Sequence, residues 1–171
     1  ATIVQAAKDY NINEAYLLAH AIIESEWGCS PLSQGLLWNR DEREWEDCGY
    51  LNFFGIGAFD SDPENGASFG KYYGWSTPEA AIRGGAAWIS KYYIHSGNTS
   101  SGDQNTLWKM AWDATAAQKY GNMSHAHQYA TSCTWAIGIA RTMDNLYTRH
   151  MGGHFDFDEL GISVIVPVFK D

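Results

Sequence analysis

A glutamate near the end of a predicted helix is the residue of this sequence best suited to acid-base chemistry. Asn13 is a favourable N-cap for a helix over residues 13–27. Leu17, Ala21 and Glu24 recur at i, i+4 and i+7 on its apolar face. Burial on that face disfavours the charged form of a carboxyl group. We therefore expect Glu24 to have a raised pKa and to be able to donate a proton near neutral pH, as a general acid does.

The helix alone leaves a second interpretation of Glu24 open, because a single glutamate near a helix C-terminus is more often partly exposed or hydrogen-bonded than catalytic. Glu26 lies roughly 200° further round the same helix, so we expect it to face solvent. Residues 31–49 lose the helical periodicity and carry the charged run NRDEREWED. That segment predicts an exposed excursion beside the cleft that Glu24 faces.

Composition and charge limit the classes of partner. The 171 residues suit one domain, and a hydrophobic content of 45% with 8 tryptophans is sufficient for a core. Trp and Tyr rings that are not used in the core can stack on sugars or nucleobases. The 20 acidic against 11 basic residues give a net charge of −9, which argues against nucleic acid and against an anionic membrane as partners. The sequence has no apolar run of about 18 residues, so we expect no transmembrane helix.

The cysteines leave two interpretations open. Three of them, Cys29, Cys48 and Cys133, cannot all pair within one chain, and their spacing fits no common zinc pattern. Both a Cys29–Cys48 disulfide and three unpaired thiols fit the sequence. A nucleophilic Cys29 is not expected, because it follows a helix end and no helix N-terminus lowers its pKa. The chain begins at Ala1 without a methionine or a signal peptide, so we expect an excised domain or a mature product.

Metal ions and other cofactors are not expected. His125 and His127 are alternate residues, and His150 and His154 flank a pair of glycines, so we expect four surface histidines. Residues 60–66, DSDPENG, resemble the start of a calcium-binding loop, but the glutamate at the twelfth position is absent. We interpret that segment as a turn.

Periodicity and capping residues predict a mainly helical chain. The predicted helices cover residues 2–10, 13–27, 76–93, a short segment from 106, and 132–149. Their predicted buried residues include, in the last two long helices, Ile82, Ala86, Ile89, Tyr93, Ala136, Ile139, Ala140, Met143, Leu146 and Tyr147. Two glycines inside the 76–93 helix, at 84 and 85, predict close packing against another helix there. Residues 50–60 predict a twisted hairpin or an extended loop, and residues 163–169 an edge strand or extended tail.

Five motifs occur together in one order: AHAIIESEWG followed by Ser30, NFFGIGAFDSDP, GW with TPEAAIRGGAAWI, QNTLWKMAW and HQYAT. Together they resemble the catalytic domains of glycoside hydrolase family 73, the bacterial N-acetylglucosaminidases of which the Gram-positive autolysins are examples. The resemblance runs from about Tyr10 to Tyr147. It implies a mainly α, lysozyme-like, two-lobed α+β domain with a small β-hairpin beside the catalytic helix and a long substrate groove. We expect residues 1–171 to form one catalytic domain, with a core at about 10–150 and an extended tail at 151–171.

The same resemblance implies a secreted peptidoglycan hydrolase of the cell wall or cell surface. It would cut the β-1,4 bond between N-acetylglucosamine and N-acetylmuramic acid and leave N-acetylglucosamine at the reducing end, without a cofactor. We expect a monomer tethered to wall-binding modules, since a net charge of −9 is unusual for an enzyme of anionic walls. The alternatives are a muramidase of the same fold and an inactive glycan-binding or phage-tail module.

Site residues follow from the resemblance motif by motif. Glu24 matches the family's general acid. Asp60 matches an aspartate across the groove that orients water or stabilises positive charge, although it also fits an N-cap or turn. Tyr129 matches a tyrosine that holds the N-acetyl group or supports the oxocarbenium-like transition state. The residues expected to shape the sugar subsites are Asn52, Phe54 and Gln128.

The chain departs from the family pattern at two places. Ser132 stands where many relatives have an aspartate, but a serine can also cap a helix. Residues 113–126 form a longer stretch than expected. The sequence leaves open whether Asp60 acts as a base, giving inversion, or the substrate's own N-acetyl carbonyl attacks, giving retention.

Overall fold

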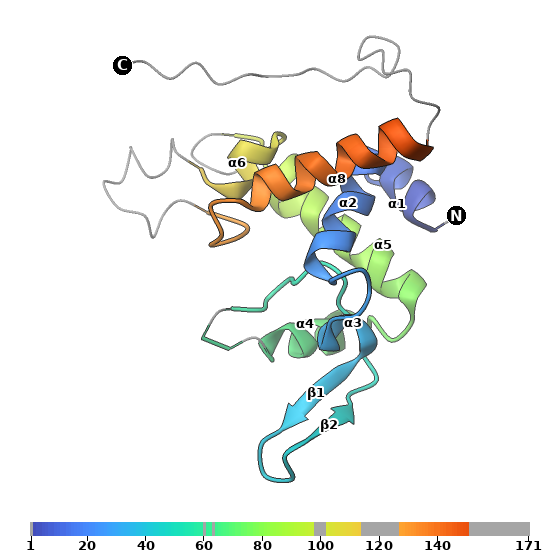
Figure 1. The fold of residues 1–171 in the computed structure, drawn as a ribbon, viewed down its shortest axis with the longest axis vertical. Helices are drawn as coiled ribbons and strands as arrows, with labels where there is room; N and C mark the ends of the chain where they lie inside the picture. The colour runs from blue at the N-terminus through green and yellow to red at the C-terminus, as the bar shows by residue number, and fades with distance from the viewer. Residues whose placement is uncertain (1, 60, 63, 98–101, 114–126, 151–171) are drawn as a thin grey trace.

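The structure is a computed structural model that describes residues 2–59, 61–62, 64–97, 102–113 and 127–150. Most of these residues are helical (Figure 1). The helices are α1 (Thr2–Asp9), α2 (Glu14–Glu24), α3 (Pro31–Gln34), α4 (Asn65–Tyr73), α5 (Pro78–Ile89), the π-helix η1 (Ser90–Ile94), α6 (Leu107–Ala111) and α8 (Trp135–His150). The two strands are β1 (Leu36–Asn39) and β2 (Glu44–Asp47). No helix among the described residues is both long and apolar enough to cross a membrane.

Helix α2 begins as the sequence predicts and ends three residues early. The Asn13 side chain accepts a hydrogen bond of 2.9 Å from the Tyr16 N–H, which confirms the N-cap. Ser25 ends the helix, and Glu26 and Trp27 then take positive φ angles of 51° and 62°. Glu24 is therefore the last residue of α2, and Glu26 is exposed as predicted.

Among the described residues, one lobe is built from α1, α2, α5 with η1, α6 and α8. In Figure 1, α8 lies across α2 near α6, and α1 packs against both α2 and α5. The predicted stripes are buried along α5 and most of α8, including Ala86, Ile89 and Ile139. The prediction for Ala140 is wrong, because the buried stripe of α8 is centred nearer Ile139 and leaves Ala140 exposed. This lobe supplies the rigid support for Glu24.

The second lobe contains α3, α4 and the β1–β2 hairpin, which projects away from the helices (Figure 1). The strands are antiparallel, with Trp38 opposite Trp45. The hairpin thus lies inside the segment predicted as an irregular excursion, whereas residues 50–59 form the extended alternative, with one bridge from Phe59 to Asp62. Strand β2 is exposed along its whole length, so it lacks the alternating pattern that identifies a strand.

Helix α4 was not predicted, because glycines weaken its helical signal. The structure gives a packing reason for two of them. A Cβ atom on Gly66 would lie 2.8 Å from Leu32 Cδ1, and one on Gly70 would lie 3.2 Å from Tyr50 Cβ. Gly84 and Gly85 of α5 are required in the same way, since a side chain there would overlap the rings of Trp75 and Phe54 respectively. The close packing at Gly84 and Gly85 is therefore against aromatic rings of two loop residues, and not against another helix as predicted.

The remaining expectations concern the cysteines, the C-terminal tail, and the histidines together with the long stretch 113–126. All three cysteines are free, and Cys29 and Cys133 are exposed. The expected tail at 151–171, with its edge strand, lies outside the described residues. His125, His154 and nearly all of the long stretch 113–126 also lie outside them.

Candidate active site

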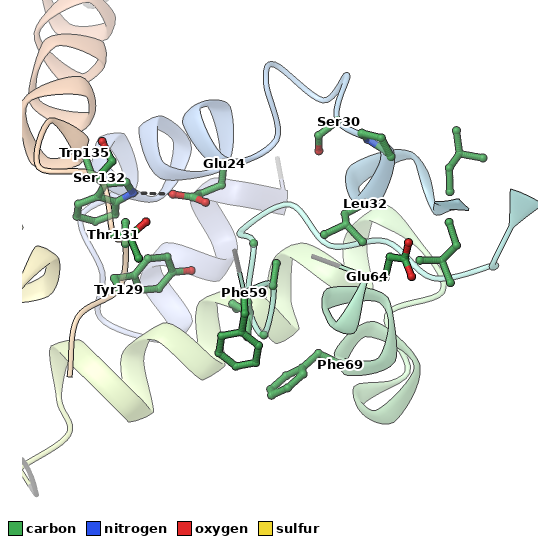
Figure 2. Close-up of a pocket in the computed structure, with 18 of the residues that line it drawn as sticks. Glu24, Ser30, Leu32, Phe59, Glu64, Phe69, Tyr129, Thr131, Ser132 and Trp135 are labelled. Carbon is green, nitrogen blue, oxygen red and sulfur yellow. Dashed lines mark hydrogen bonds between the residues drawn. The ribbon is translucent and has the colours of Figure 1, made fainter. Parts of the chain in front are cut away.

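A groove of about 1060 Å³ runs along both lobes and contains Glu24. Its walls come from the end of α2, from α3, the hairpin, residues 55–59, α4, α5 with η1, and residues 128–135. Figure 2 shows Glu24, Tyr129 and Trp135 gathered at one end, with Leu32, Glu64 and Phe69 further along. The volume lies at the top of the range of small-molecule pockets, so the groove has room for an extended ligand.

The Glu24 carboxyl is held by a residue far along the chain. Trp135, at the start of α8, donates a hydrogen bond of 2.6 Å from its indole Nε1–H to Glu24 Oε1 (Figure 2). Burial raises the pKa of Glu24, and this hydrogen bond opposes the rise because it stabilises the carboxylate. The position at the C-terminus of α2 also disfavours a negative charge. Glu24 thus keeps its proton to a higher pH than an exposed glutamate.

The second carboxylate oxygen lies against a backbone turn. Gly55 has a φ of +63°, and a Cβ atom there would lie 2.7 Å from Glu24 Oε2. Only glycine adopts that backbone easily and also leaves space for the carboxyl. The turn at Gly55 therefore lies against the carboxyl oxygen that does not bond to the Trp135 indole.

Gly55→Ala should reduce both activity and stability. The left-handed backbone costs an alanine roughly 1 kcal/mol, and the added methyl group must displace the Glu24 carboxyl. We expect at least a tenfold fall in kcat, measured on the purified variant together with its thermal unfolding.

Gly49→Ala is the matched control for that experiment. Gly49 has a φ of +71°, but a Cβ atom there meets nothing within 4 Å. It therefore carries the backbone cost without the contact. Equal kcat values for the two variants would show that the Gly55 contact does not matter to the acid.

Tyr129 is fixed beside Glu24 at both its backbone and its ring. Its N–H donates to the Met110 carbonyl at 2.9 Å, and its hydroxyl donates to the Phe54 carbonyl at 2.6 Å. Its ring is stacked on Trp135, with centroids 5.5 Å apart. Burial, reinforced by the nearby Glu24, raises the pKa of Tyr129 well above its usual value. The hydroxyl stays neutral, and its oxygen can still accept a hydrogen bond.

The three expected subsite residues occupy different positions. Gln128 is exposed and lines the groove. Asn52 is 2% exposed, and its amide is used within the protein: Nδ2 donates to the Ile56 and Gly66 carbonyls, and Oδ1 accepts from the Phe54 and Ile56 N–H groups. Phe54 is fully buried and, like Asn52, does not line the groove.

The comparisons with known proteins agree with this arrangement. The family profile described as Glucosaminidase, Mannosyl-glycoprotein endo-beta-N-acetylglucosaminidase, matches residues 1–148. The chain belongs to the glucosaminidase family. This confirms the resemblance to glycoside hydrolase family 73.

Individual relatives of this glucosaminidase chain come from Gram-positive bacteria. The Beta-N-acetylglucosaminidase of Bacillus subtilis is 42% identical over 91% of this chain, and the Bifunctional autolysin of Staphylococcus aureus is 37% identical over 91%. The chain spans only 16% and 12% of the lengths of these two proteins.

A solved structure matches the glucosaminidase chain in fold as well as in sequence. A catalytic mutant of S. aureus autolysin E in complex with the disaccharide NAG-NAM is 32% identical, with a TM-score of 0.63, over 86% of this chain and 58% of that one. The fold of the chain is the lysozyme-like fold of these autolysin domains, as the sequence predicts.

Two further positions of the glucosaminidase chain, Asp60 and Ser132, were singled out by comparison with the family motifs. Asp60 lies outside the described residues, so its expected place across the groove stays a prediction. Ser132 lines the groove, and its hydroxyl accepts a 3.3 Å hydrogen bond from the Thr134 N–H just before α8. Thr134 precedes the first residue of α8, so this bond closes a turn before the helix, and a capping role of Ser132 stays a prediction.

Sequence reasoning missed Trp135 and His20, which complete the site of this glucosaminidase domain. His20 is fully buried one turn before Glu24, and its ring meets the rings of Tyr129 and Trp135 edge to face at 4.5 and 5.2 Å. Its Nδ1 lies 2.8 Å from the Tyr16 hydroxyl, while Nε2 has no hydrogen-bond partner among the described residues. His20 is thus the support behind the two rings that flank the acid. A buried indole needs an acceptor for its N–H, and that rule could have pointed to Trp135.

His20 predicts a specific loss of stability in acid. Burial lowers the pKa of His20 to about 3, so between pH 6.5 and 3 the unfolded chain binds a proton that the folded chain does not. Stability then falls as the pH falls, by about 3 kcal/mol from pH 6.5 to pH 4 for this group.

The fall in stability between pH 6.5 and pH 4 can be measured by thermal unfolding of wild type and His20→Asn. Asparagine keeps a polar contact with Tyr16 but does not titrate. The variant should be less stable than wild type near neutral pH, because it loses the ring, and its unfolding temperature should depend less on pH, so the difference shrinks in acid. Parallel curves for the two proteins would contradict a buried neutral histidine.

Metal binding has no support at this site. Among the described residues, one group of acidic, His or Cys side chains could share an ion, namely Glu42, Glu44 and Glu46 of the hairpin. All three are exposed, and none of them lines the groove with Glu24. Exposed carboxylates at this spacing are ordinary on a solvated hairpin.

Proposed function

We propose that this chain is the catalytic domain of a peptidoglycan hydrolase that cuts the β-1,4 bond between N-acetylglucosamine and N-acetylmuramic acid. It would leave N-acetylglucosamine at the new reducing end. The observation that carries the proposal is the half-buried Glu24 carboxyl, held by Trp135 in a groove that extends along both lobes. The glucosaminidase family and the NAG-NAM complex of autolysin E support the same substrate class.

Glu24 acts as the general acid in this mechanism. It protonates the departing glycosidic oxygen while the sugar flattens toward an oxocarbenium ion, a step that general acid catalysis accelerates by about 10²–10⁴-fold. Tyr129 presents its hydroxyl oxygen beside the acid, where it can accept from the substrate's acetamido N–H or face the developing positive charge. Gln128 contacts the sugar directly, whereas Asn52 and Phe54 shape the subsite by fixing the loop that carries Gly55.

The attack on the anomeric carbon takes one of two routes. Glu64 also lines the groove, but Figure 2 places it beyond Leu32, away from Glu24. The second role therefore falls to Asp60, which would activate water and give inversion, or to the substrate's own N-acetyl carbonyl, which would give retention. The anomeric configuration of the first-formed product distinguishes the two routes.

The proposal also covers the localisation of the protein and its binding partner. The chain acts outside the cell on glycan strands of the wall, as a monomer in which residues 1–171 form one catalytic domain. The named relatives are several times longer than the chain. We propose that wall-binding modules of a longer protein bring this acidic domain to an anionic wall.

Digestion of purified peptidoglycan tests the function. The soluble fragments are reduced with borohydride and identified by mass spectrometry, with Glu24→Gln as the inactive control. Fragments that end in reduced N-acetylglucosamine, produced by wild type alone, are expected. Reduced muramic acid ends would indicate a muramidase. Tight binding to the wall without fragments would indicate a glycan-binding module.

A further inference from the structure

The hairpin presents two tryptophans to the groove. Trp38 of β1 and Trp45 of β2 are directly opposite each other, and their rings meet edge to face with centroids 5.3 Å apart. Both line the same groove as Glu24. They remain 37% and 52% exposed, although β2 is otherwise made of charged residues. Two large aromatic rings are thus partly exposed to solvent on a short, polar hairpin.

The stability of the hairpin can explain why the two rings contact each other, but it does not explain why they line the groove. A two-stranded hairpin is marginal in isolation, and a cross-strand aromatic pair stabilises it. An indole also offers a broad apolar face with a polar edge, which suits the alternating C–H and hydroxyl surface of a pyranose ring. Because the rings line a continuous groove, a ligand bound at Glu24 can extend to them.

We propose that Trp38 and Trp45 form a carbohydrate-stacking subsite that holds a sugar ring of the same glycan strand, away from the bond cut at Glu24. The proposal rests on the proposed function, since it assumes that the groove receives a glycan. The subsite gives the domain a preference for long strands over short oligosaccharides.

Polar groups at the edge of the pair complete the subsite. Arg40, in the hairpin turn, and Glu64, before α4, lie 3.8 Å apart and both line the groove. Their side chains are 77% and 39% exposed, so their ion pair is weak and each is free to bond with sugar hydroxyls. Arg40 is also the only cation among the described residues that line the groove, and it suits the carboxylate of a muramic acid.

The experiment compares two double variants with a matched control. Trp38→Leu with Trp45→Leu keeps an apolar cross-strand pair but removes the flat faces, whereas Trp38→Phe with Trp45→Phe keeps a smaller face. Trp108→Leu is the control, because Trp108 is 49% exposed but does not line the groove. Each change is made in the Glu24→Gln background. Dissociation constants are then measured by calorimetry for peptidoglycan glycan strands of two, four and eight sugars.

The Leu pair should weaken binding of the eight-sugar strand about tenfold and leave the disaccharide unchanged, while the Phe pair keeps most of the affinity. Equal weakening at every length would mean that the hairpin has merely been disrupted, and it would overturn the subsite. No weakening at any length, or the same effect from Trp108→Leu, would overturn it as well. If the wild-type domain cut no peptidoglycan while the length-dependent loss appeared, the proposed function would fail and the subsite would stand.

Discussion

Glu24→Gln should lower the rate of peptidoglycan hydrolysis by at least 10²-fold while the domain stays folded. Glutamine has the shape of glutamate, and its Oε1 can still accept the Trp135 hydrogen bond, but it has no proton to give to the leaving group. The rate is measured as release of reducing ends from purified walls, with circular dichroism to verify the fold. A folded variant with wild-type activity would remove Glu24 from the mechanism.

The same variant should be more stable than wild type at neutral pH. Burial raises the pKa of Glu24 above its usual 4.5, so the folded chain holds a proton that the unfolded chain has released. Stability therefore falls as the pH rises from 4.5 through the raised value, and glutamine abolishes that loss. We expect the unfolding temperature of Glu24→Gln to exceed that of wild type at pH 7, with the difference shrinking below pH 4.5. The acid would then be retained at a cost in stability.

Trp135→Phe should produce the next largest effect on activity. Phenylalanine preserves much of the stacking with Tyr129 and His20 but removes the donor to Glu24 Oε1. A hydrogen bond to a charged group contributes about 1.5–3 kcal/mol, so we expect kcat to fall about 10- to 100-fold as the carboxyl loses its fixed position.

The pH profile of kcat/KM distinguishes the hydrogen-bonding role of Trp135 from a role in packing alone. The indole stabilises the carboxylate, so its removal raises the pKa of Glu24 further. Because the acid must be protonated to work, the high-pH limb of kcat/KM should move to higher pH in Trp135→Phe. Trp112→Phe, which changes an exposed indole outside the groove, is the control and should leave the limb in place. An unmoved limb in Trp135→Phe would limit Trp135 to packing.

The sequence predicted the helix and the raised pKa of Glu24 because the relevant signals are local. The cap at Asn13 and the spacing of Leu17, Ala21 and Glu24 lie within one helix, and helical periodicity reports which face is buried. Trp135 is 111 residues away from Glu24, and no local pattern records such a contact. Its place at the end of the buried stripe that contains Ile139 was the available clue, and the partner of its N–H could come only from tertiary structure.

The position of the hairpin and the internal hydrogen bonds of Asn52 could not be predicted from the sequence, for different physical reasons. The strands are four residues long and one is wholly exposed, so hydrophobic patterning is weak there. Asn52 belongs to a family motif, and a polar residue in such a motif suggests a ligand contact. In the structure its amide fixes the turn that places Gly55, and Asn52 is not among the residues that line the groove.

The distance along the chain between Glu24 and its indole donor has a consequence for biosynthesis. Helix α2 lies near the N-terminus, whereas α8 is synthesised more than a hundred residues later. A nascent chain that has not yet reached Trp135 holds the acid without its donor, and it also lacks Tyr129 until shortly before. Under the proposed mechanism, a product truncated before Tyr129 and Trp135 carries the general acid without its donor and should cleave the wall much more slowly than the complete domain.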